Sequence, residues 1–94
     1  MKKYEELLTA KFAWSDVYYI ARNVIERIDQ ADAEEDVTDA LGNALDEELI
    51  YIEDQWTLCK YYAIPTDCKW GEVIEQFYND LYPIAELYVQ ECED

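Results

Sequence analysis

The chain has 94 residues, of which seven are Lys or Arg and 23 are Asp or Glu, giving a net charge of -16 at neutral pH. This length fits one small domain, and a hydrophobic fraction of 51% excludes a disordered acidic tail. The charge argues against direct binding to nucleic acid or to an anionic membrane, and the sequence has no histidine, the commonest general base. We therefore expect one acidic domain over residues 1–94 whose charged partners are basic.

The first half of the chain shows helical periodicity, because its apolar residues recur at intervals of three and four. Residues 3–12 are consistent with a short helix or an extended arm. Ser15 or Asp16 is placed to cap a helix that runs to about Asp29 with a continuous apolar stripe. Residues 30–35 are polar and are expected to connect this helix to the next. The fold class predicted is all-α.

The second half predicts two longer helices. Asp36 is placed to cap the first of them, and Asp39 adds negative charge near its N-terminal end. The apolar stripe continues to about Tyr62, which predicts one helix of about 26 residues. A further helix is predicted to be capped within residues 66–67 and to reach the C-terminus, with a kink or break near Pro83. The architecture predicted is a compact bundle of three main helices.

An acidic cluster distinguishes this sequence from that of an ordinary helical domain. From Glu26 to Asp54 there are 12 acidic residues and one basic residue, Arg27. Such a run repels itself and lacks the lysines that normally form ion pairs along a solvated helix. The candidate partner-binding residues are Asp29, Asp32, Glu34, Glu35, Asp36, Asp39, Asp46, Glu47, Glu53 and Asp54, together with Tyr51 and Tyr62.

The density of this charge decides whether it could imitate a nucleic acid. Spread over the roughly 5,700 Å² of surface expected at this size, the net charge averages about one per 360 Å². B-DNA carries about one charge per 110 Å². Concentrated on one face, the carboxylates would approach the duplex value, and their spacing along a helix resembles that of phosphates. The alternative is that the acids only keep a small domain in solution.

The spacing of three acidic residues also suggests a calcium site. Asp32, Glu34 and Asp36 alternate as the first ligands of a calcium loop do, but Val37 and Asn43 stand where its glycine and its bidentate glutamate belong. We therefore expect no metal site.

Paired carboxylates, Glu34 with Glu35 or Glu47 with Glu48, could act as acid and base only in a pocket that separates their pKa values. The sequence predicts no such pocket, no nucleophile motif and no phosphate-binding loop. We expect no catalytic residues, no cofactor and no enzymatic activity.

Three cysteines, Cys59, Cys68 and Cys92, form neither an even set nor a C-x-x-C pair. We expect free thiols in a reducing cytosol. The sequence predicts neither a signal peptide nor a membrane span, which also favours a cytoplasmic location.

Nine tyrosines are the second unusual feature of the composition. Tyrosine is enriched where proteins meet, because it combines apolar area with a hydroxyl group. The tyrosines expected near the surface are Tyr19, Tyr51, Tyr62, Tyr78 and Tyr82. The tryptophans, expected in the core, are Trp14, Trp56 and Trp70.

Two segments carry a resemblance to a known group of proteins. Glu35-Asp36-Val37-Thr38-Asp39-Ala40 leads to Ala44-Leu45-Asp46, and the final acidic helix holds Phe77-Tyr78-Asn79-Asp80-Leu81-Tyr82. In this pattern of acidic and apolar positions, over roughly residues 16–90, the chain resembles the small acidic helical DNA mimics of phages, the antirestriction and anti-CRISPR proteins.

The resemblance implies a non-enzymatic inhibitor, encoded by a phage or mobile element, that occupies the nucleic-acid channel of a CRISPR effector or restriction nuclease in a bacterial host cell. Two other interpretations stay open. One is an immunity protein or antitoxin that neutralises one basic toxin nuclease, with tyrosine and tryptophan anchors. The other is an adaptor subunit that forms a homodimer through exposed tyrosines.

Overall fold

A computed structural model describes residues 2–13, 15–62 and 69–92 of the chain. The described residues form six helices, and the predicted all-α fold is confirmed. The prediction of three main helices is wrong, because the predicted helix of about 26 residues is divided in two and residues 30–35 form a helix of their own. The helices are α1 (Lys3–Phe12), α2 (Val17–Glu26), α3 (Gln30–Glu35), α4 (Val37–Glu48), α5 (Ile52–Tyr62) and α6 (Trp70–Cys92).

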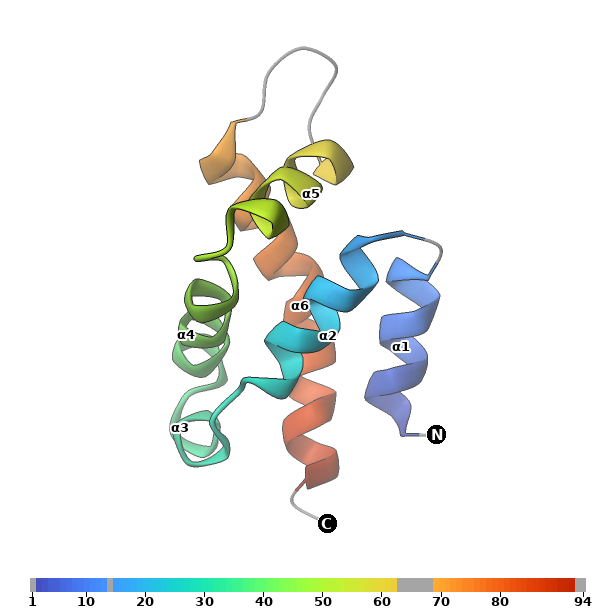
Figure 1. Ribbon diagram of the computed structural model, residues 1–94. Coiled ribbons are helices and arrows are strands. Elements are labelled where there is room, and N and C mark those ends of the chain that lie inside the picture. Colours follow the sequence, from blue (N-terminus) through green and yellow to red (C-terminus); the bar gives the residue numbers. More distant parts are fainter. Residues whose placement is uncertain (1, 14, 63–68, 93–94) are drawn as a thin grey trace.

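Helix α6 lies at the centre of the fold and contacts each of the other five helices (Figure 1). Helices α1 and α4 lie on opposite sides of it, and α5 crosses near its N-terminal end. Of the kink or break predicted near Pro83, the break is absent, since α6 continues through this residue. Pro83 and Asn79 are both exposed, so water can satisfy the Asn79 carbonyl that loses its helical partner.

The core is built from the apolar stripes that the sequence shows. Every helix contributes at least one side chain to it, and α2 and α6 contribute the most. Its largest fully buried side chains are Phe12, Phe77, Leu8, Ile25, Leu41, Leu58, Leu81 and Ile84.

The predicted helix of about 26 residues is interrupted between α4 and α5. The run Leu49-Ile50-Tyr51-Ile52 is apolar at four consecutive positions, and one helical face cannot bury four neighbours in sequence. The side chain of Gln55 donates a hydrogen bond to the Leu49 carbonyl (2.6 Å), which satisfies a group left free where α4 ends. The interruption lets α5 turn and bury Leu58.

The polar stretch after α2 is a helix rather than a plain connection. The Asp29 carboxylate accepts hydrogen bonds from the amides of Ala31 (2.9 Å) and Asp32 (3.2 Å), and so caps α3. The Asp36 carboxylate accepts one from the Thr38 amide (2.9 Å), which confirms the predicted cap of α4. Two acidic residues of the cluster therefore also hold helix ends.

The predicted N-terminal cap of α2 is wrong, and α1 has a cap that was not predicted. Asp16 precedes α2 but makes no capping hydrogen bond, and Ser15 instead donates to the Phe12 carbonyl at the end of α1 (2.8 Å). Residues 3–12 form a helix, whose first amides, Lys3 and Tyr4, donate to the carboxylate of Glu91 (2.9 and 2.7 Å). A carboxylate near the end of α6 thus caps α1.

The expectation of free thiols is wrong for Cys59, which is disulfide-bonded. Cysteine spacing gave no signal of this bond, because pairing depends on the distance between residues in the folded chain. The predicted start of the last helix at residues 66–67 lies outside the described residues, and so does Trp14.

Candidate partner-binding surface

Exposed carboxylates line the side of the molecule formed by α3, α4 and the turns before them. We call this surface the acidic edge. Its residues are Asp29, Asp32, Glu34, Glu35, Asp36, Asp39, Asp46 and Glu47, all exposed. They point outward because the opposite faces of α3 and α4 bury Ala33, Ala40, Leu41, Ala44 and Leu45. Folding therefore leaves eight carboxylates of the acidic run exposed on two neighbouring helices.

The net charge is divided unequally between the two sides of the fold. The first 27 residues, which hold α1 and α2, contain five of the seven basic residues and only four of the 23 acidic residues. Between residues 30 and 48 there are eight acidic residues and no basic residue. Since α1 and α4 lie on opposite sides of α6, the molecule has a nearly neutral side and a strongly negative side (Figure 1).

Ion pairing leaves the acidic edge uncompensated. The ion pairs within the described ranges are Lys11–Asp80 (3.1 Å), Arg22–Glu26 (3.1 Å) and Arg27–Glu48 (2.7 Å). None of the three involves a carboxylate of the acidic edge. Its potential is therefore weakened by water, by salt and, at Glu47, by the nearby charge of Arg27, and it is available to a cationic partner.

One acid of the predicted cluster is buried and acts inside the fold. Glu48, at 3% exposure, accepts hydrogen bonds from Arg27 Nε (2.7 Å) and Asn23 Nδ2 (3.2 Å) on α2. Asp54, a predicted partner-binding residue, is half-buried beside it. Burial, followed by a hydrogen bond with Glu48 and the nearby negative charges, raises the pKa of Asp54. These two carboxyl groups are part of the α2–α4–α5 packing.

Asp54 makes stability depend on pH. Its folded pKa lies above the unfolded value of 3.8, so the folded state holds the proton more tightly. Its contribution to the free energy of unfolding therefore falls as pH rises from about 4 through the raised pKa. Asp54→Asn is expected to stabilise the protein at pH 7, by at most about 1 kcal/mol because water screens the site, and to flatten this fall. Urea unfolding of both proteins at several pH values between 4 and 8 measures this, and parallel curves would contradict it.

An exposed apolar group at the junction of α4 and α5 was not predicted. We call it the junction patch; its residues are Ile50, Tyr51, Ile52 and Trp56, with exposures of 71%, 50%, 55% and 65%. The prediction that Trp56 lies in the core is wrong, because α5 turns away from the line of α4 and directs Leu58 inward instead. Trp70 packs against the core, as predicted.

The tyrosine predictions are partly correct. Tyr19 and Tyr51 are exposed, but Tyr62, Tyr78 and Tyr82 are half-buried against the core, and Tyr61 is exposed instead of Tyr62. The Tyr62 hydroxyl donates to Asp80 Oδ2 (2.6 Å), and burial followed by this bond raises the pKa of Tyr62.

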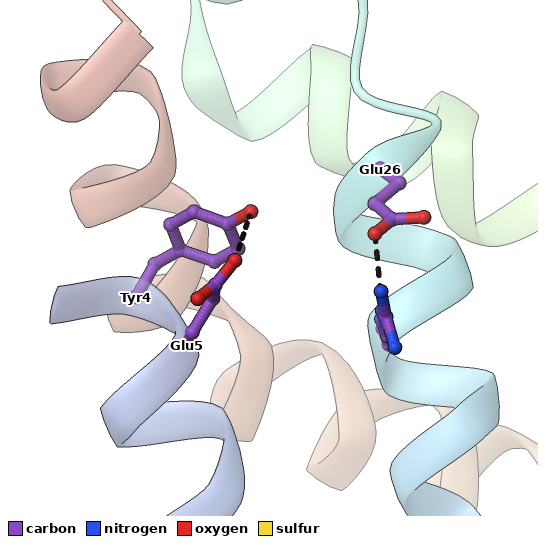
Figure 2. Close-up of polar contacts among 4 residues, drawn as sticks. Tyr4, Glu5 and Glu26 are labelled. Atoms are coloured by element: carbon purple, nitrogen blue, oxygen red, sulfur yellow. Dashed lines mark hydrogen bonds and ion pairs between the residues drawn. The ribbon is translucent and has the colours of Figure 1, made fainter. Parts of the chain in front are cut away.

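The side of the fold opposite the acidic edge offers shallow hollows. Figure 2 shows Tyr4 and Glu5 of α1 facing Glu26 of α2. The Tyr4 hydroxyl donates to Glu5 Oε1 (3.3 Å), and burial together with the Glu5 charge raises the pKa of Tyr4 to about 12. A hollow of about 150 Å³ lies between these helices, and one of about 430 Å³ lies beside Tyr19. The dashed lines in Figure 2 join Tyr4 to Glu5 within α1 and Glu26 to a neighbour within α2, so each of these acids already has a partner on its own helix.

Among the described residues, neither a metal site nor a membrane-spanning helix indicates the function, and neither does a known relative. Within the part of the chain that the structure describes, no three His, Cys, Asp or Glu side chains gather so that they could hold a metal ion. No helix in the described ranges combines the length and apolar character that a membrane crossing requires. Protein-family models, curated proteins and solved structures yielded no match to this chain.

Proposed function

We propose that the protein is a non-enzymatic, DNA-mimicking inhibitor, encoded by a phage or mobile element, that blocks the nucleic-acid channel of a CRISPR effector or restriction nuclease. The observation that supports this is the acidic edge: eight exposed carboxylates on one side of the fold, with no basic residue between positions 30 and 48. The nucleases act in the bacterial cytoplasm. That compartment is reducing, so the Cys59 disulfide is expected to be open for part of the protein's life there.

Charge density supports mimicry only when the charge is gathered on one side. The accessible surface of 6062 Å² gives about one net charge per 380 Å², against about one per 110 Å² for B-DNA. The nearly neutral α1–α2 side leaves the negative charge on the remainder of the surface, which raises its density toward the duplex value. An edge of this kind competes for a basic channel with fast association and with affinity that falls as salt rises.

A charge-reversal variant of the acidic edge tests the proposal. Asp29 and Asp36 are left unchanged because they cap helices. Asp32 and Asp39 are also left unchanged, because acids in the first turn interact favourably with the helix dipole. The variant Glu34→Lys, Glu35→Lys, Asp46→Lys, Glu47→Lys changes only last-turn positions, where lysine favours the helix. Nuclease cleavage assays on a panel of CRISPR effectors and restriction enzymes are expected to show at least about a 100-fold loss of inhibition.

A matched variant distinguishes the effect of the acidic edge on inhibition from the effect of the net charge. Glu6→Lys, Glu72→Lys, Glu75→Lys, Glu86→Lys changes four exposed acids of α1 and α6 and alters the net charge equally. Because Glu6 and Glu72 lie in first helical turns, circular dichroism must first show that this variant is as helical as the wild type. It is expected to keep inhibition within about threefold, because its charges are distributed elsewhere. An equal loss in both variants would show that only net charge matters. A wild-type protein that inhibits no member of the panel would reject the proposed function.

The second candidate is an immunity protein or antitoxin specific for one basic toxin nuclease. The junction patch favours it, because binding energy in specific complexes is concentrated in exposed aromatic and apolar anchors. In that case Trp56→Ala would weaken inhibition of the toxin more than the reversal of the acidic edge. Trp56→Ala, compared with the variant of the acidic edge in cleavage assays that include toxin nucleases, thus separates the two candidates.

A further inference from the structure

The junction patch is an apolar surface with a defined geometry. Ile52 and Trp56 are one turn apart on α5 and so lie on the same helical face, and Ile50 and Tyr51 occupy the turn that precedes it. All four side chains are at least half exposed. Scattered exposed apolar residues are ordinary, but a continuous group of this kind marks an interaction site.

Carboxylates border this patch on both sides. Asp46 and Glu47 precede it at the end of α4, and the exposed Glu53 follows it in the first turn of α5. Two cations lie nearby: Arg27, whose charge is felt by both Tyr51 and Glu47 but which is paired with Glu48, and the exposed Lys60, one turn after Trp56 on α5. Carboxylates outnumber these cations, so the patch is an apolar centre within a mainly negative rim.

The charge of this rim identifies what can cover the patch. A second copy of the chain would bring the same carboxylates against it, and like charges across a contact oppose association. A basic surface would instead place its cations on the rim and its apolar side chains on the centre. This arrangement, with a desolvated apolar core and a polar rim, is the one that specific protein interfaces use.

We propose that the junction patch docks a basic amphipathic segment of the target protein, with Trp56 as the central anchor and the flanking carboxylates as its rim. The identity of that target as a nuclease rests on the proposed function, but the docking itself requires only a segment that is both basic and apolar. DNA offers no such apolar anchor. The patch therefore gives the inhibitor selectivity for one target among proteins with basic channels.

Two labelled peptides of equal charge test this docking. One has about 14 residues of lysine and leucine in a helical pattern, and the other carries serine in place of each leucine. Fluorescence anisotropy at about 150 mM salt is expected to show at least about tenfold tighter binding of the lysine–leucine peptide to the wild-type protein. Trp56→Ser is expected to reduce this preference to within about twofold. Tyr19→Ser is the matched control, since Tyr19 is equally exposed (67%) but lies on α2 beside α1, and it is expected to keep the preference.

The other results overturn the proposal in distinguishable ways. A preference that persists in Trp56→Ser would show that the patch is not the docking site. Sedimentation that reveals a wild-type dimer, absent in Trp56→Ser, would assign the patch to a second copy of the chain. A peptide preference that depends on Trp56, found together with no inhibition of any nuclease in the panel, would support the docking site and reject only the proposed function.

Discussion

Arg27→Ala is expected to lower the melting temperature by about 10 °C or more, although Arg27 is itself largely exposed. The effect comes from the residue left behind. The Glu48 carboxylate has a side-chain exposure of 4%, and without Arg27 it loses its ion-pair partner, while the Asn23 amide still donates to it. It also faces Asp54, so the variant would leave a buried negative charge beside another carboxyl group.

Arg22→Ala is the control for this prediction. Arg22 lies on the same helix and pairs with Glu26 at 3.1 Å, but both side chains are about half exposed. Exposed pairs contribute little, so its melting temperature is expected to stay within about 3 °C of the wild type. Thermal unfolding followed by circular dichroism measures both variants. Equal melting temperatures for the two would mean that the Arg27–Glu48 pair does not hold α2 against α4.

The apolar periodicity of the sequence predicted the helices well but not where they end. The core stripes of α2 and α6 are those expected, because each long stripe has one burial solution. The break after Leu49 has no proline or glycine to mark it, and its signal is four consecutive apolar residues followed by Glu53 and Asp54 in a new first turn. Pro83, where a kink or a break was predicted, does not end its helix, because an exposed proline can be accommodated within a well-packed helix.

The candidate surface was predictable in its charge and not in its apolar part. The carboxylates of α3 and α4 had to be exposed, since burying so many without cations would cost more than the fold can supply. Glu48 differs because Arg27 reaches it across 21 residues of sequence, a pairing that depends on how α2 meets α4. The exposure of Ile52 and Trp56 likewise follows from the direction that α5 takes after the break, which periodicity cannot give.

Leu58→Ala is expected to cost about 3 kcal/mol and to loosen α5 before the remainder of the fold. Leu58 is fully buried and is the only buried side chain of α5, whereas α4 and α2 each bury five residues. Hydrogen exchange is expected to show lost protection in residues 52–62, with α6 and α2 still protected. Because Ile52 and Trp56 are carried by α5, the variant should also weaken the preference for the lysine–leucine peptide while the acidic edge on α3 and α4 keeps its charge. Uniform loss of protection in all helices would instead show that α5 unfolds only together with the core.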